Sequence, residues 1–309
     1  MPRSPALLAV ALLCAGIFVF SLQDVIIKGV SGLYPVHEAI AIRCVTALPI
    51  LLAMVHLRGG LGLLLSPHAG WLALRGGVMM VSYTCYYLSF PLMPLAQVVA
   101  LFFTAPLFVT ALAGPLLGER IGIKRWLATI LGFAGVIVIQ RPGLSVFDAG
   151  SLFPIAAALA YAAAQLMARR LGETDSAQVM SFYQNAVYFV GAMAMALLFR
   201  GADTGAAGRL SFLLRDWSMP TNMDLMLLGA CGPLAALGMT LLTQAYRVSE
   251  VNFVTPFEYT GLIWAALWGF SIFGEVPAWT TLVGALLIVA AGLYVLFSAK
   301  PPGVHAELS

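Results

Sequence analysis

Long apolar runs, separated by short polar or Gly/Pro-containing segments, occupy almost the whole chain. A run of about 20 apolar residues is long enough to cross a hydrocarbon core of about 30 Å as an α-helix. Charged residues, glycines and prolines interrupt the runs, and these residues are typical of helix ends and turns. The pattern predicts ten helical spans, over residues 5–28, 36–56, 70–92, 94–117, 122–140, 149–169, 177–199, 225–247, 250–273 and 277–298.

The composition agrees with a chain that lies mostly in a membrane. Of the 309 residues, 61% are hydrophobic and 9% are charged, whereas soluble domains have about 25% charged residues. This excludes a soluble enzyme, a disordered chain and a disulfide scaffold. The net charge of +3 gives no indication of nucleic-acid binding. The N-terminal apolar run is long and lacks a small-residue cleavage site, so we expect it to be retained as the first span. The four cysteines lie in apolar runs without a C-x-x-C pair, which favours buried hydrophobic roles over redox or metal binding.

The Lys and Arg residues between the spans predict the orientation. Nine lie at the termini and in the even-numbered connections, and five lie on the opposite side. Cytoplasmic loops are enriched in Lys and Arg, so we expect both termini, including the tail 301–309, in the cytoplasm of a bacterial-type inner membrane. Three of the five opposite residues, Arg200, Arg209 and Arg215, lie in or beside the long connection 200–224.

The two halves of the chain resemble each other. Gly118-Glu119 closes the fourth span and Gly274-Glu275 closes the ninth, and a short loop and a glycine-containing span follow each pair. The repeat unit is therefore five spans, which divides the chain into residues 1–143 and 144–300. An odd number of spans inverts the second copy relative to the first. Inverted repeats are typical of secondary transporters, whose substrate site lies near the midplane between the halves.

This duplicated order of apolar span, Gly-Glu, short loop and glycine-containing span resembles the EamA-type transporters of the drug/metabolite transporter superfamily. Residues 94–136 and 254–292 resemble the ends of the two EamA repeats. The resemblance implies a basket of ten helices around a central cavity. It also implies transport of amino acids or related small metabolites, and the bacterial YddG-type amino-acid exporters are the nearest analogy. Where the second repeat often has a proline after Glu258 this chain has Tyr259, so we expect the kink at Pro256 instead.

Charged residues inside the predicted spans are costly in a bilayer and usually face the interior of the bundle. Asp24 and Lys28 share one face of the first span, where a pair across one helical turn can form. Lys28 and Glu38 lie near span ends, and we expect them to extend to the membrane interface. Glu258 is the principal site candidate, because it can bind the amine of a zwitterionic substrate or carry a coupling proton. Pairing with an arginine is the structural alternative. The six charged residues are Asp24, Lys28, Glu38, Arg43, Arg75 and Glu258.

Polar side chains recur at helical spacing in spans 4, 6 and 8, and aromatic side chains gather in spans 3 and 9. Any one of them can serve helix packing, but together they predict a cavity for a small, partly apolar ligand. The tryptophans at span ends, Trp71, Trp126 and Trp279, are typical of membrane interfaces. The substrate-binding candidates are Glu258, Asp24, Tyr83, Tyr87, Gln97, Thr104, Tyr161, Gln165, Thr240, Gln244 and Trp264.

The sequence therefore favours a secondary transporter that exports amino acids or related small metabolites by alternating access. Three alternatives stay open: a membrane-embedded enzyme acting on a lipid or lipophilic substrate, a channel, and an uptake carrier for another small metabolite within the same family. The enzyme would need a metal-binding or nucleophile–base motif, and the channel a filter motif; the sequence contains neither. We expect no cofactor, metal or nucleic acid, only a small-molecule substrate and membrane lipid. The oligomeric state is left open.

Overall fold

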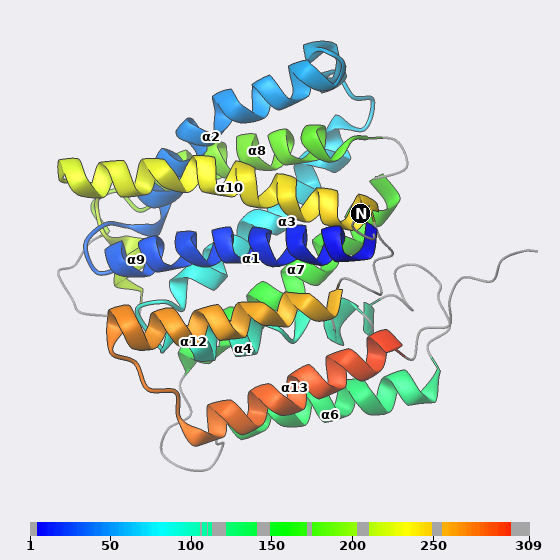
Figure 1. Cartoon of the computed structure of the whole chain (residues 1–309). Helices are drawn as coiled ribbons and strands as arrows, with labels where there is room; N and C mark the ends of the chain where they lie inside the picture. The colour runs from blue at the N-terminus through cyan, green and yellow to red at the C-terminus, as the bar shows by residue number, and fades with distance from the viewer. Residues whose placement is uncertain are drawn as a thin grey trace, which may run out of the picture.

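The computed structural model describes residues 5–105, 107–109, 111–112, 122–140, 149–171, 175–202, 210–248 and 255–297. All regular secondary structure in these ranges is helical. Most of the long helices run side by side along one common direction (Figure 1). The molecule is thus a helical bundle, as the hydrophobic pattern predicts.

The first half of the chain contributes helices that, apart from the fourth, end close to the predicted limits. Pro35 precedes α2 in an extended conformation (ψ 151°), as expected of a residue that cannot donate a backbone hydrogen bond. The short 3₁₀ helix η1 (Leu61–Leu64) lies between α2 and α3. The helices are α1 (Pro5–Val30), α2 (Val36–Gly59), α3 (Ala69–Leu88), α4 (Leu95–Phe102) and α6 (Ile123–Gln140).

The second half contains the remaining helices. Ser176 caps α8 by accepting a hydrogen bond from the Val179 N–H at 3.4 Å, a common helix-start contact. The long connection that follows α8 contains one helical turn, α9. The elements are η2 (Ala149–Ser151), α7 (Leu152–Leu171), α8 (Ala177–Leu198), α9 (Ser211–Leu214), α10 (Asn222–Val248), η3 (Thr255–Tyr259), α12 (Thr260–Phe273) and α13 (Trp279–Phe297).

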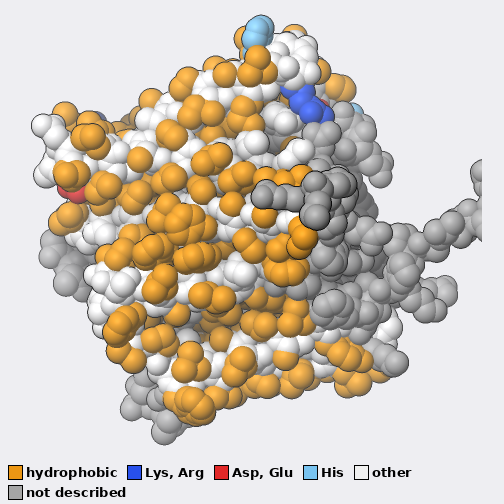
Figure 2. Space-filling model, viewed as in Figure 1, with side chains coloured by type: hydrophobic (Ala, Val, Ile, Leu, Met, Phe, Trp, Pro, Cys, Tyr) orange, Lys and Arg blue, Asp and Glu red, His pale blue; other side chains and the backbone are white. Residues whose placement is uncertain are grey.

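Several helices are suited to a membrane. Within the described residues, four are long and apolar enough to cross one, over Leu7–Val30, Val36–Gly59, Ala177–Leu198 and Asn222–Leu242. Shorter apolar helices occupy Trp126–Ile139, Leu152–Ala168 and Trp279–Ala291. Figure 2 shows a face covered almost entirely by hydrophobic side chains, with charged ones only towards its margins. A soluble protein rarely exposes so large an apolar surface.

The helices pair across the two halves of the chain. α1 packs along α10, α3 along α7, α2 along α8 and α6 along α13, and α4 contacts α12. At the α6–α13 crossing, a side-chain carbon at Gly135 would lie 2.7 Å from the Gly284 carbonyl oxygen, and one at Gly284 would lie 2.5 Å from the Gly135 carbonyl oxygen. Small residues let helix backbones approach this closely in a membrane. The last helix of each half is therefore held to the other by backbone contact.

The fourth predicted span differs from the structure. We expected one helix over 94–117, but α4 ends at Phe102, and Phe103 and Thr104 form a turn. The Thr104 hydroxyl donates to the Leu101 carbonyl oxygen at 2.7 Å, a local bond that competes with helix hydrogen bonding. Pro106, the expected kink, lies outside the described residues. The helix α4 thus ends four residues before the proline.

Candidate functional site

A carboxylate held by two tyrosines lies at the centre of the bundle. Tyr86 donates to one oxygen of Asp24 and Tyr87 to the other, each at 3.0 Å. Both tyrosines belong to α3, and Asp24 belongs to α1. Among the described residues, no ion pair to Asp24 is seen. A carboxylate with two hydroxyl donors and no cation keeps free capacity to accept a positively charged or hydrogen-bond-donating group.

An arginine from α2 adjoins this carboxylate through an amide. Arg43 Nε donates to Gln23 Oε1 at 3.1 Å, and Gln23 Nε2 donates to the Tyr87 hydroxyl at 2.7 Å. The guanidinium carbon lies 4.7 Å from the ring centroid of Tyr83 and 5.8 Å from that of Tyr188. Cation–π contacts of this kind stabilise a charge in a desolvated site. The Nη1 atom of Arg43 is buried without a hydrogen-bond partner, so the cluster has an unused donor.

A second arginine lies beside the same tyrosine. Arg75 Nη1 donates to Gln184 Oε1 at 3.2 Å, and Gln184 Nε2 donates to the Tyr188 hydroxyl at 3.2 Å. The Tyr188 hydroxyl in turn donates to the Met79 carbonyl oxygen at 3.0 Å. α3 and α8 are therefore joined by hydrogen bonds inside the bundle. Such networks fix the geometry of a site when their members are satisfied.

Several of these side chains line internal space. Asp24, Tyr83, Tyr86 and Tyr161 lie between the packed helices, yet each retains accessible surface. A group that is deep in the bundle and still accessible must face a void large enough for water. Such a space, lined by aromatic rings and a few polar groups, is typical of a small-molecule site.

Aromatic rings from α1 and α12 extend this lining. Trp264 and Trp268 stack with ring centroids 6.2 Å apart, and Phe18 meets Trp264 edge-on at 4.8 Å. Trp268 Nε1 donates to the Ser21 hydroxyl at 3.0 Å, which fixes one tryptophan to α1. These side chains are partly accessible. The group offers flat apolar faces against α1, where Ser21 lies about one helical turn before Asp24.

Glu258 lies in a different position from the one expected. We predicted it one turn inside the ninth span, but it lies in η3, before α12 begins at Thr260. It is partly buried and close enough to interact electrostatically with the hydroxyls of Tyr161 and Tyr259. Tyr161 also bonds Gln165 within α7. Glu258, Tyr161 and Gln165 thus form a group on the α7 and α12 side of the bundle.

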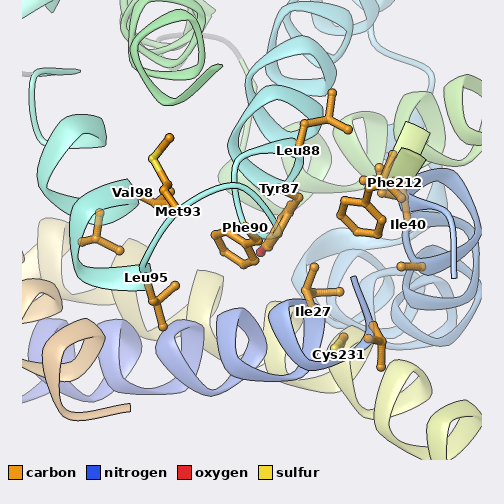
Figure 3. Packing of buried hydrophobic residues seen from close by; sticks show 14 of the residues in the cluster. Ile27, Ile40, Tyr87, Leu88, Phe90, Met93, Leu95, Val98, Phe212 and Cys231 are labelled. Carbon is orange, nitrogen blue, oxygen red and sulfur yellow. The ribbon is translucent and has the colours of Figure 1, made fainter. Parts of the chain in front are cut away.

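The pair between Asp24 and Lys28 that the helical spacing allows does not form. Lys28 Nζ instead contacts Glu275 Oε1 at 2.8 Å and donates to the carbonyl oxygens of Phe90 and Met93 at 2.9 and 3.0 Å. Its side chain is 8% exposed, so it does not extend to the interface. Three acceptors satisfy all three ammonium protons, which a single carboxylate one turn away would not do. Figure 3 shows the α3–α4 connection, which carries Phe90 and Met93, lying over α1 near Ile27.

The second Gly-Glu pair explains this contact. Gly274 ends α12 in the left-handed conformation (φ 65°), which glycine adopts at little cost. The turn directs Glu275 towards α1 and α4, where Glu275 Oε2 accepts from the Leu95 N–H at 2.8 Å. We call the contacts of Lys28, Glu275, Phe90, Met93 and Leu95 the clasp. It joins one end of α1, α4 and α12. The first Gly-Glu pair, Gly118-Glu119, lies outside the described residues.

Glu38 also differs from its expected place. It is 3% exposed and accepts a hydrogen bond from the Ser218 N–H at 3.3 Å. The connection after α8 covers it, so Glu38 does not extend to the interface. Its short side chain finds a backbone partner close to the helix start, where a carboxylate is favoured.

The structure separates the remaining candidates. Tyr83 and Tyr87 belong to the central cluster, and Gln97 lies in the first turn of α4. Thr104 is fully buried and bonded to its own backbone. Thr240 and Gln244 are exposed and line a small separate pocket with Met54, between α2, α8 and α10. Helical spacing identified their shared face but not which neighbour that face meets. A substrate role for each stays a prediction.

Several central residues were absent from the predicted set, namely Gln23, Arg43, Tyr86, Tyr188 and Trp268. Gln23 is adjacent in sequence to Asp24, and Tyr86 to Tyr87, so their neighbours in the predicted set could have indicated them. Arg43 was recognised as a charge inside a span but not as a site residue. Nothing in the sequence near Tyr188 distinguishes it from other apolar-run tyrosines.

The fold defines a helical membrane protein with a cluster of polar and aromatic side chains in its interior. The chain belongs to the EamA-like transporter family, whose sequence profile matches residues 7–141 and 148–297. It is therefore a membrane transporter of small metabolites. The two matched segments correspond to the two halves that resemble each other.

Relatives of this chain are named for different substrates. A riboflavin transporter of Vibrio cholerae is 33% identical over 73% of this chain and 71% of its own. An S-adenosylmethionine uptake transporter of Rickettsia prowazekii is 26% identical over 74% and 71%. The pseudopaline exporter CntI of Pseudomonas aeruginosa is 28% identical over 89% and 90%. A solved crystal structure at 18% identity, which covers 93% of this chain and 96% of the other, has a TM-score of 0.63 and supports the fold alone.

Proposed function

We propose that this chain is a secondary carrier that moves amino acids or related small metabolites across the inner membrane by alternating access, with export as its direction. One observation carries the proposal: Asp24 lies deep between the helices, accessible, without an ion-pair partner among the described residues, and beside aromatic and amide groups. A charged group in a bundle interior marks a substrate or ion path. It can receive the amine of a zwitterionic substrate.

Many carriers that work by alternating access are built from two related halves, and recurring contacts support a ten-helix inverted repeat over 1–143 and 144–300. A side-chain carbon at Gly76 of α3 would lie 3.4 Å from the backbone of Gln184 in α8, and one at Gly232 of α10 would lie 2.6 Å from the backbone of Arg43 in α2. Gly232 follows Gly76 by 156 residues, and Gln184 follows Arg43 by 141. The contact thus recurs with the halves exchanged.

If the two halves are related by a two-fold axis, a residue on that axis should contact the equivalent residue of the other half. Phe103 and Tyr259 are also 156 residues apart, and their rings meet edge-on at 5.1 Å. An odd number of spans per half then makes the two copies inverted, with the site between them.

The clasp supports a state that is closed at one end. Lys28 lies four residues beyond Asp24 in α1, about 6 Å along the helix axis. The clasp thus stands between the central carboxylate and the helix end. In the predicted orientation this end faces away from the cytoplasm. Opening towards that side would separate Lys28 from Glu275.

The aromatic lining favours a second candidate, uptake or export of a larger metabolite with a planar ring. Trp264, Trp268 and Phe18 offer flat faces, and Trp268 bonds Ser21, which lies about one helical turn before Asp24 in α1. Two relatives are named for riboflavin and S-adenosylmethionine, which both contain heteroaromatic rings. Ring stacking and a carboxylate partner would suit such a substrate.

Transport in proteoliposomes tests these proposals. The purified chain is reconstituted and supplied with labelled amino acids, riboflavin and S-adenosylmethionine, with and without a pH gradient. Saturable uptake with counterflow supports a carrier, and the substrate that competes identifies the class. Steady conductance would instead indicate a channel, and chemical change of a lipid an enzyme.

The variant Glu258→Gln addresses the second acid. It removes the charge and keeps the size of the side chain. We expect slower transport with an unchanged amount of folded protein. Wild-type rates would end the assignment of Glu258 to the transport path.

A further inference from the structure

A cavity outside the central site lies at the end of the bundle where α8 ends and α2 begins. It has a volume of about 360 Å³ and is bordered by the segment that follows α9. Its polar lining includes Arg200, Arg215 and His37, and its apolar lining includes Met193 and Leu197. None of these residues belongs to the central cluster or to the clasp.

Specific hydrogen bonds hold the walls of this cavity in place. Gly201, in the turn that follows α8, has φ 74°, and its N–H donates to Asp216 Oδ1 at 2.8 Å. Trp217 Nε1 donates to His37 Nδ1, and their rings are nearly parallel at 6.1 Å. The segment after α9 is thus attached to the ends of α8 and α2. The cavity is consequently a defined feature of the fold.

The polar side of the cavity has an excess of positive charge. Arg200 and Arg215 face a single acid, Asp216, which already accepts a backbone N–H. Arg215 Nη1 is buried and has no hydrogen-bond partner among the described residues. A guanidinium offers a planar fork of donors that matches a phosphate. Within the described residues, the cavity therefore offers guanidinium donors without a matching anion.

The apolar side of the cavity continues onto the outer surface of α8. Leu197 is 70% exposed and Met193 is 37% exposed, and α8 is one of the helices long and apolar enough to cross a membrane. An acyl chain lying along this surface would bring its headgroup to the helix end, where the arginines are. A free phosphate would gain nothing from Leu197.

We propose that this cavity binds the phosphate of an anionic phospholipid, with an acyl chain along α8. The proposal is independent of the transported substrate. It also gives a reason for the arginines at the 200–224 connection, since cytoplasmic loops, not loops on the predicted opposite side, are normally enriched in Lys and Arg. Basic pockets between transmembrane helices are a known type of site for anionic lipid headgroups.

Lipid binding to the full chain in detergent tests the proposal. Native mass spectrometry counts bound phosphatidylglycerol and phosphatidylcholine, and inorganic phosphate is added in a separate arm. We expect phosphatidylglycerol to be retained in preference to phosphatidylcholine. The double variant Arg200→Gln/Arg215→Gln should lower its affinity about ten-fold or more, as expected for the loss of charge-assisted hydrogen bonds. Arg58→Gln, an exposed arginine elsewhere, is the matched control and should change nothing.

Two further variants keep the test decisive if the double variant is unstable. Arg215→Lys retains the charge and should retain part of the preference, and Leu197→Gln should weaken lipid binding without altering the response to phosphate. Equal binding of the two lipids, or equal weakening by Arg58→Gln, would overturn the proposal. Displacement of the lipid by millimolar phosphate, with no effect of Leu197→Gln, would identify a soluble-anion site instead.

Discussion

Asp24 is a buried acid whose partners are neutral. Its two hydroxyl donors, Tyr86 and Tyr87, come from one helix and hold both carboxylate oxygens. Arg43 lies near but bonds Gln23 instead. Burying a carboxyl group without an ion pair is costly, and ionisable groups kept inside a membrane bundle are typically functional. This is the physical reason for placing it on the transport path.

Replacing Asp24 with Asn tests this role. The amide keeps the size and removes the charge, so we expect transport to fall at least about ten-fold, the effect of losing one strong charged contact. Proteoliposome uptake and melting temperature are measured together. Asp224→Asn is the matched control, because Asp224 also accepts from a tyrosine hydroxyl, that of Tyr34 at 2.7 Å, but lies at the start of α10. Unchanged transport in Asp24→Asn with a lowered melting temperature would assign the acid to stability alone.

At the scale of helices, two kinds of contact hold the bundle together. Glycine crossings bring backbones together, as at Gly135 and Gly284, and the clasp joins helix ends by charge. The crossings leave no space for rearrangement, whereas the clasp consists of one ion pair and a few hydrogen bonds. Helix pairs joined at glycines are therefore expected to move as units, and the clasp to open.

A substitution at the α6–α13 crossing tests the first kind. Gly135→Val places carbons where the Gly284 carbonyl lies, and overpacking of this sort costs about 1–3 kcal/mol. We expect a lower melting temperature in detergent. Gly77→Val is the control, since a side chain at Gly77 of α3 meets nothing within 4 Å. Equal melting temperatures for the two variants would show that the crossing is not close-packed.

Removing the clasp tests the second kind. Lys28→Met should increase the access of a membrane-impermeant thiol reagent to a cysteine placed at Tyr161, because the closed end loses its ion pair. Breaking a buried ion pair costs about 3–5 kcal/mol when one charge is left without its partner. The double variant Lys28→Met/Glu275→Gln removes both charges, so it separates opening of this end from misfolding. If neither variant alters labelling, the clasp has no part in closing this end.

At the scale of the whole molecule, the clasp and the proposed lipid cavity lie at the same end of the bundle. The ends of α1, α8 and α12 and the start of α2 all meet there. The predicted orientation puts this end outside the cytoplasm. The long connection after α8 then covers Glu38 and His37 on that side.

Cysteine labelling in intact cells tests the orientation. In a chain whose four cysteines are replaced, Met219→Cys, at a position 95% exposed, should react with an impermeant reagent added outside. Leu65→Cys, 88% exposed before α3, should react only after permeabilisation. The reverse pattern would invert the molecule and make the clasp a cytoplasmic closure.

The sequence by itself determined the properties that depend on local pattern. The length of the apolar runs fixed the membrane class and most helix limits, and the repeated Gly-Glu order identified the family. The break after Phe102 was expected at Pro106 instead, because a side-chain bond from Thr104 cannot be read from hydropathy.

Only the tertiary structure decided which charges meet. Lys28 and Glu275 stand far apart in the sequence, and the nearer partner, Asp24, is bound by tyrosines. Thr240 and Gln244 share a helical face, yet that face meets α2 and α8 rather than the central cluster. Periodicity determines which side chains share a face of one helix, but the neighbour of that face is set by how helices pack against each other, often through glycine crossings.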